Sequence, residues 1–219
     1  INVAFRGDFA AGTVEKLAEG KWGAHVDAVS ADHSAVTISE GYTSGDHVIR
    51  LWRPGEPLRL LFGTPMEDRV EGQDYPLNAV VPVHFTAGQR GLLFSTALFD
   101  DSYGLGYLDL SGESQPQPVA VTGQRHTGAG ELDRLEHLTG NRFHVGYNID
   151  GVSWLYEGVF DEEARAMWLA HVLAGEGPVG GGVLESVYYD EAGDRTILAY
   201  STATSPTQIY SYATSNAEP

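Results

Sequence analysis

A serine nucleophile is the first chemistry to test for, because the chain contains no cysteine. A serine hydrolase needs a serine, a histidine and an acid in contact, with the serine on a sharp strand-to-helix turn written Gly-x-Ser-x-Gly. The sequence lacks this pattern. In the nearest string, GYTSG at 41–45, Ser44 is one position out of register and lies between two expected strands. We therefore predict that Ser44 is not a nucleophile and that the chain carries no catalytic residue.

The histidines do not show the spacing of a metal site. No pair has the H-x-H or H-x-x-x-H pattern, and metal ligands are normally clustered. A site assembled from separate repeats stays open, but we expect hydrogen-bonded structural histidines and no metal or cofactor. Two of them, beside Phe85 and Phe143, are expected to pack between sheets. The eight are His25, His33, His47, His84, His126, His137, His144 and His171.

Two carboxylate pairs, Asp100-Asp101 and Glu162-Glu163, could serve glycoside hydrolysis. That reaction needs two carboxyl groups facing each other across a cleft, and adjacency alone does not provide this. Ser102, Tyr103 and Gly104 follow the first pair, which is typical of a turn. A glycoside-active enzyme of five propeller blades is therefore kept as the least favoured alternative.

Phosphate-binding motifs are weak in this chain. No Walker-type P-loop string occurs, and the letters G-x-G-x-x-G appear once, at 175–180. A dinucleotide site needs a strand before this motif and a helix after it. Here Pro178 and the following glycines predict a loop, so we expect no dinucleotide site.

The elements that would position these residues are short strands. Apolar runs separated by polar turns predict a hairpin at the start of the chain, then four antiparallel strands in succession, as in one propeller blade. The stretch 161–174 has helix formers, yet its place in the repeat favours a strand. The first four-strand set is Ala24 to Ser30, Ala35 to Ser39, His47 to Trp52 and Leu58 to Phe62.

This strand pattern recurs with a period of roughly 50 residues, which predicts an all-β propeller of about four to five blades. Aromatic residues recur on the third strand of each repeat, where we expect them to pack between sheets rather than to form a ligand platform. They are Trp52, Tyr107, Trp154, Tyr156, Tyr210 and Tyr212. The expected boundaries are a partial blade at 1–20, then repeats at about 21–70, 75–125, 130–176 and 180–213, with Pro118 to Thr122 as the fourth strand of the second repeat.

The first and last strands of the chain bear on the size of the ring. These two strands occupy the same blade position, whereas a cleanly closed ring normally needs complementary ends. The pattern therefore indicates either a five-bladed ring with a redundant strand or part of a larger ring, and we prefer the larger ring.

The composition of the chain indicates which classes of binding partner are not expected. The formal net charge is −17, from 30 acidic and 13 basic residues, so a phosphate backbone would be repelled and nucleic-acid binding is not expected. No apolar run long enough for a transmembrane helix occurs, and the first residues do not read as a signal peptide. We expect a protein without a membrane partner, located in the cytoplasm.

Two segments carry a family resemblance. The string ESVYYDEAGDRTILAYSTATSPTQIY at 185–210 resembles the last propeller blade of prolyl-oligopeptidase-family serine peptidases, which include acylaminoacyl peptidases. The string NIDGVSWLY at 148–156 resembles a middle blade. Lactonase-like and TolB-like propellers share this style. In the peptidases, a propeller of seven or eight blades caps an α/β-hydrolase domain, which follows it in the chain, and admits peptides but not folded proteins.

The resemblance therefore implies a non-catalytic propeller that selects peptide substrates for a hydrolase domain, in the same polypeptide or as a companion chain. No catalytic position of the family can be matched in this sequence, and no substrate-binding residue can be named. The alternative is a stand-alone propeller that acts as a binding or assembly module. Its acidic surface would favour basic partners, and assembly with copies of itself stays open.

Overall fold

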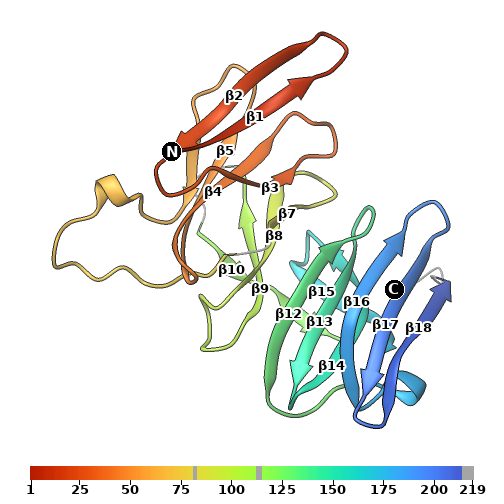
Figure 1. Cartoon of the computed structure of the whole chain (residues 1–219). Coiled ribbons are helices and arrows are strands. Elements are labelled where there is room, and N and C mark those ends of the chain that lie inside the picture. The colour runs from red at the N-terminus through yellow and green to blue at the C-terminus, as the bar shows by residue number, and fades with distance from the viewer. Residues whose placement is uncertain (81–82, 112–114, 214–219) are drawn as a thin grey trace. The chain divides into compact units, whose positions relative to one another are not determined.

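The computed structural model describes residues 1–80, 83–111 and 115–213, and strands make up most of the regular structure (Figure 1). The chain divides into two compact units. The first comprises Ile1–Asp101 and Gly106–Gln117, and the second comprises Ser102–Leu105 and Pro118–Pro219. Within the described residues, no helix has the length and apolar character needed to cross a membrane.

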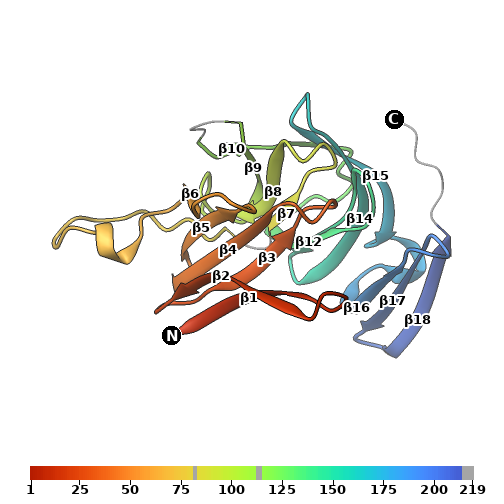
Figure 2. The ribbon, with the colours of Figure 1, turned by 90° about the horizontal axis from the view of Figure 1, so that it is seen from above.

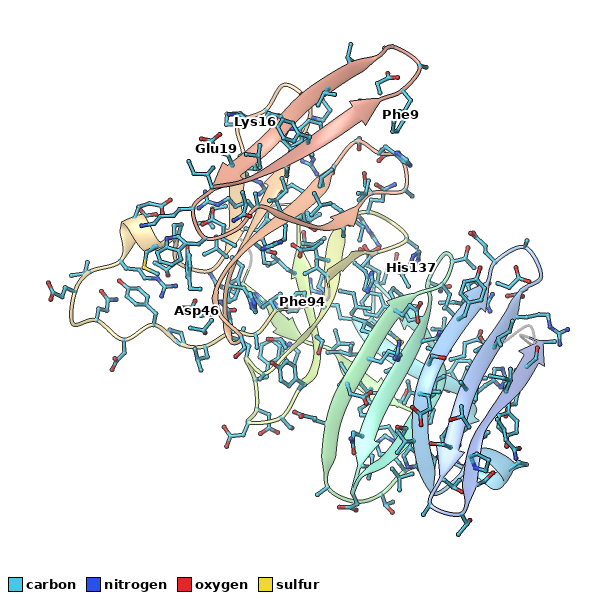
Figure 3. All side chains as sticks on the ribbon, in the orientation of Figure 1. Phe9, Lys16, Glu19, Asp46, Phe94 and His137 are labelled. Atoms are coloured by element: carbon cyan, nitrogen blue, oxygen red, sulfur yellow. The ribbon has the colours of Figure 1, made fainter. Side chains whose placement is uncertain are left out.

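The first unit begins with the expected hairpin, β1 (Asn2–Asp8) and β2 (Thr13–Gly20). Its turn forms because the Asp8 carboxylate accepts hydrogen bonds from the backbone N–H groups of Ala10 and Ala11, both at 2.9 Å. Phe9 at the tip of the turn is exposed to solvent (Figure 3). The inner face of the hairpin packs on the next sheet through a small cluster that includes Leu17, Ile38 and Trp52.

The next sheet contains four antiparallel strands that follow one another in chain order (Figure 2). They are β3 (His25–Val29), β4 (Val36–Thr43), β5 (Asp46–Trp52) and β6 (Arg59–Phe62). A third sheet has the order β10-β9-β8-β7, with β7 (Val83–Phe85), β8 (Gly91–Thr96), β9 (Gly104–Asp109) and β10 (Gln117–Pro118). An apolar core that includes Ile49, Phe94 and Leu108 joins these two sheets.

Sheets of the same kind build the second unit. A five-stranded sheet has the order β11-β15-β14-β13-β12, and a three-stranded sheet has the order β16-β17-β18. The strands are β11 (Ala120–Thr122), β12 (Gly130–His137), β13 (Arg142–Ile149), β14 (Val152–Asp161), β15 (Ala166–Ala174), β16 (Gly182–Asp190), β17 (Arg195–Thr202) and β18 (Ser205–Ala213).

The strand expected within 161–174 is confirmed as β15, and the three strands expected in the last repeat are confirmed as β16, β17 and β18. The preceding turn ends at Arg165, whose backbone φ of 52° lies in the left-handed region. The assignment of successive sheets to blades of one ring, the repeat boundaries and the number of blades stay predictions.

The single strand expected from Pro118 to Thr122 is wrong. β10 pairs with β9, Val119 follows it, and residues 120–122 form β11, which adds in parallel to β15. Pro118 has no N–H with which to continue the first ladder. Val119 is buried and donates its N–H to the Leu105 carbonyl, and Ala120 donates to the Arg165 carbonyl at the edge of the other sheet.

Candidate functional site

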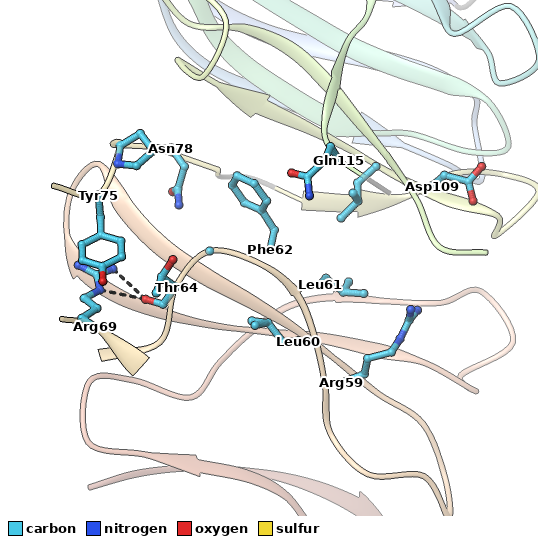
Figure 4. A pocket seen from close by; sticks show the side chains of 13 residues that line it. Arg59, Leu60, Leu61, Phe62, Thr64, Arg69, Tyr75, Asn78, Asp109 and Gln115 are labelled. Atoms are coloured by element: carbon cyan, nitrogen blue, oxygen red, sulfur yellow. Dashed lines mark hydrogen bonds between the residues drawn. The ribbon is translucent and has the colours of Figure 1, made fainter. Parts of the chain in front are cut away.

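A recess of about 530 Å³ opens in the first unit beside β6 (Figure 4). Its volume lies within the usual range of ligand sites. One side is formed by the four residues of β6, and a second side by the loop that leads from β6 toward β7. The remaining side is formed by residues of β9 and the segment after it: Leu108, Asp109 and Gln115.

Arg69 fixes the loop that forms one wall. Its Nη1 and Nη2 lie 2.7 and 2.8 Å from the two carboxylate oxygens of Asp46, which is itself buried. The guanidinium also donates to the Thr64 carbonyl and lies 4.7 and 4.9 Å from the ring centroids of Tyr42 and Tyr75. The hydrogen bond to Asp46 raises the pKa of Arg69 above its usual value. With its charge already paired, Arg69 holds the wall in place.

The far end of the same loop is fixed by Asn78. Its side chain accepts a hydrogen bond from the His47 N–H at 3.0 Å and donates to the His47 carbonyl at 2.7 Å. This pair imitates a strand pairing, so the loop returns to the edge of β5 without a strand of its own. Both ends of the loop are therefore held by buried polar contacts, and we expect the recess to be largely preformed.

Arg59 brings to the recess a charge that no described carboxylate pairs. Its Nη2 donates to the Leu110 carbonyl at 3.1 Å, and among the described residues no carboxylate forms an ion pair with it. Leu61 and Phe62 supply apolar surface, and neither histidine nor serine is among the described lining residues. The recess is therefore suited to binding an apolar group beside an anionic one, and not to nucleophilic chemistry.

A second polar cluster, in the second unit, supports the segment 123–129. Tyr156 Oη accepts the backbone N–H groups of Arg125 and His126, and lies 2.7 Å from Nδ1 of His126. The imidazole contacts the rings of Tyr147 and Trp154, at centroid distances of 4.6 and 5.7 Å. Burial lowers the pKa of His126 and raises that of Tyr147 to about 12, so both stay neutral near neutral pH.

This cluster supports a segment that crosses the sheet. Segment 123–129 leads from β11 at one edge of the five-stranded sheet to β12 at the other. It therefore covers four strand spacings, about 19 Å, and an extended chain of this length reaches about 27 Å. The segment is long enough to form a strap across one face of the sheet, and the aromatic rings of β13 and β14 support it.

The serine and carboxylate residues that the sequence offered for catalysis lie in turns and loops. Ser44 is exposed in the two-residue turn between β4 and β5, and Thr43 pairs with Asp46 across that turn. Asp100 and Asp101 lie in an exposed loop, where the Asp101 N–H donates to Asp100 Oδ1 at 2.7 Å. Glu162 and Glu163 lie in the turn between β14 and β15. The structure brings none of these residues into the recess.

The glycine motif at 175–180 is confirmed as a loop. The segment follows β15, contains the three-residue 3₁₀ helix Gly177–Val179 and leads into β16, so no α-helix follows the motif. Gly175 has a φ of 120° and lies against the Trp154 ring, where a side chain would clash. The packing of the Trp154 ring therefore accounts for the glycine at position 175.

The histidines are distributed over both units, and the described part of the chain contains no group of three or more histidine or acidic side chains that could hold a metal ion. The expected packing of His144 between sheets is confirmed. Its buried imidazole lies 2.8 Å from Thr196 Oγ1 on β17 and 3.4 Å from Glu136 Oε2 on β12.

Structural packing is also confirmed for several of the recurring aromatic residues. Trp52 is buried beneath the first hairpin, and Tyr210 and Tyr212 pack on an apolar cluster that contains Leu155 and Tyr200. Sequence reasoning missed the recess and the strap. Proximity in sequence gives no signal for either, because Asp46 and Arg69 are 23 residues apart and His126 and Tyr156 are 30 apart.

No protein-family model matches the sequence, and no curated protein matches it. Solved structures do match. A structure from a mechanistic study of two prolyl endopeptidases has a TM-score of 0.60 and 15% identity, covering 87% of this chain and 24% of the other. A puromycin-hydrolyzing peptidase from Mycobacterium tuberculosis has a TM-score of 0.61 and 14% identity, covering 96% and 30%. A putative TolB from Agrobacterium tumefaciens has a TM-score of 0.54 and 13% identity, covering 96% and 70%.

These likenesses define the fold. The chain has an all-β fold of the propeller type, and the part of the peptidases that it matches is their propeller. It spans about a quarter of the length of the prolyl endopeptidase.

Proposed function

We propose that this chain is the non-catalytic propeller portion of a prolyl-oligopeptidase-like serine peptidase, and that it selects peptides for a hydrolase domain. One observation carries the proposal. The alignments with two peptidase structures cover 87% and 96% of this chain, but only 24% and 30% of the peptidase chains. The resemblance of 185–210 to a last blade points the same way.

The packing of the sheets supports selection by size. Buried aromatic and aliphatic side chains fill the interior, as at Phe94 in the first unit and Tyr156 in the second, and interiors of this kind resist deformation. A ring of such sheets would admit an extended peptide through its centre and exclude a folded domain. The gate would therefore select by size through the rigidity of the ring, with catalysis left to the hydrolase domain.

The first strands of three sheets each carry an acidic residue at a corresponding position. In β3, β12 and β16 the ladder register shifts at one residue, and that residue is acidic each time: Asp27, Asp133 and Glu185. In a propeller the first strand of each sheet borders the central channel. We infer that the channel carries carboxylates at corresponding depths, so cationic and neutral peptides would pass more readily than acidic ones.

The test is a fluorophosphonate probe combined with native mass spectrometry of the purified protein. The proposal expects a labelled species that contains this chain and is heavier than the chain itself. Peptides of increasing length should then be cleaved up to a size limit, and acidic peptides should be cleaved more slowly. Labelling confined to a species of this chain's own mass would contradict the proposal, because the chain lacks the hydrolase pattern.

The second candidate is a stand-alone binding module. The preformed recess beside β6, with its unpaired Arg59, favours this alternative. An unlabelled species of the chain's own mass would move it to first place, and the same spectrum would reveal any assembly of copies.

A further inference from the structure

The outer edge of β6 is open along the recess. β6 is the last strand of the sheet β3-β4-β5-β6, and no described strand pairs with its other side. All four of its residues, Arg59–Phe62, line the recess. An exposed strand edge presents unpaired N–H and C=O groups, which form a template for another extended chain.

The chain itself shows how such an edge is filled. In the second unit, β15 is the corresponding last strand of the set β12, β13, β14, β15, and β11 adds to its outer edge in parallel. Ala120, Val121 and Thr122 stand opposite Ala166, Met167 and Trp168. The same position on the first unit is occupied by the recess. Two corresponding edges therefore differ in that one carries an added strand.

The chemistry of the recess selects among extended chains. Leu61 and Phe62 pack on the core and offer apolar surface, as does Leu108 on the opposite side. Arg59 is partly buried and makes a single hydrogen bond, to the Leu110 carbonyl. The lining also contains the Asp109 carboxylate, which accepts hydrogen bonds from the Ser111 N–H and Oγ at 2.7 and 2.6 Å. The Arg59 guanidinium has no such carboxylate partner among the described residues and therefore favours an anion at its end of the recess.

We propose that this recess binds an extended peptide segment of another protein, which adds to β6 as β11 adds to β15 and places an acidic side chain beside Arg59. Main-chain pairing would supply the orientation, and the apolar floor with Arg59 would supply the side-chain preference. The wall fixed by Arg69 and Asn78 is already in place, so little ordering is needed on binding. This site does not depend on the peptidase assignment.

The experiment uses the isotope-labelled full chain and a blocked octapeptide of alternating valine and threonine with one central glutamate. Binding should shift the backbone amide signals of residues 59–64 and leave those of the hairpin β1–β2 unchanged. Two control peptides separate the contributions: lysine in place of glutamate, and N-methylation of alternate peptide bonds, which prevents strand pairing. We expect the first to bind about tenfold more weakly and the second not to bind.

A matched pair of variants tests Arg59. Arg59→Gln should weaken the glutamate peptide about tenfold and leave the lysine peptide unaffected. Arg53→Gln removes the same charge outside the recess and should change neither affinity. An unchanged amide spectrum at millimolar peptide would overturn the proposal. Binding that survives N-methylation, or that Arg53→Gln weakens as much as Arg59→Gln, would overturn it equally.

Discussion

Arg142 Nε lies 2.8 Å from Glu157 Oε1, and Glu157 is 1% exposed. The same guanidinium donates to Asp194 Oδ1 at 3.0 and 3.1 Å, from a neighbouring sheet of the second unit. Tyr189 Oη donates to this Asp194 oxygen at 2.7 Å. One cation thus neutralises a buried carboxylate and links the sheet of β13 and β14 to the sheet of β16 and β17.

Replacing Arg142 with leucine is expected to lower the free energy of unfolding by about 3 kcal/mol, because the Glu157 carboxylate would remain buried without its partner. Urea unfolding followed by circular dichroism measures the loss. The matched control is Arg125→Leu, which removes an exposed ion pair with Glu176 and should cost less than about 1 kcal/mol. Similar losses for the two variants would show that Glu157 does not need Arg142.

Asp27 is expected to destabilise the protein as the pH rises. Burial raises its pKa from 3.8 to about 6, although a hydrogen bond from Ser39 and the charge of His25 oppose the shift. The folded state therefore holds the proton of Asp27 more tightly. The contribution of Asp27 to stability is fully present below pH 3.8 and is lost as the pH rises through about 6. Asp27→Asn should be more stable than the parent at neutral pH, by about 1 kcal/mol after allowance for partial solvent exposure.

The measurement is urea unfolding of both proteins across this pH range. The difference between them should close as the pH falls below 3.8. Asp32 provides a control of opposite sign, since hydrogen bonds from Ser34 and Ser30 lower its pKa to about 2. Asp32→Asn should be less stable at neutral pH, with the difference closing as the pH falls through about 2. A constant difference for Asp27→Asn would refute the assignment.

Arg69→Met is expected to release the wall of the recess. The variant leaves the buried Asp46 carboxylate without its bidentate partner, which should cost about 3 kcal/mol and speed amide exchange in residues 63–78. Hydrogen exchange with mass spectrometry measures the protection of the amides in this loop. Lys16→Met, which removes an exposed ion pair with Glu19, should leave exchange in this loop unchanged. Unchanged protection in Arg69→Met would mean that Asn78 alone holds the loop.

Tyr156→Phe should loosen the strap. The variant removes the acceptor of two backbone N–H groups, at Arg125 and His126, and an unsatisfied buried donor costs about 1–3 kcal/mol. Protection of those two amides from exchange should fall. Tyr212→Phe removes a hydroxyl for which no hydrogen bond is seen among the described residues, so protection should persist in that variant. Equal effects of the two substitutions would assign the strap's stability to packing.

Local sequence patterns predicted much of the strand order. The Asp8 turn, the turn at Ser44 and the turn after Asp161 each depend on residues close in sequence, so their hairpins could be read directly. The pairing of β11 with β15 could not, because Ala120 meets Ala166 only after four other strands have formed. The recess was equally hidden, since its wall depends on the contact between Asp46 and Arg69.

The strap also sets an order of events in time. β11 can pair with β15 only once β12, β13, β14 and β15 are assembled, because β15 is the last strand of this sheet in chain order and segment 123–129 must then pass over the finished sheet. Closing a contact between residues 46 positions apart costs more chain entropy than forming any of the hairpins. We therefore expect the amides of β11 to be the last of this sheet to gain protection during refolding, and the strap to be the first part that opens when the sheet begins to unfold.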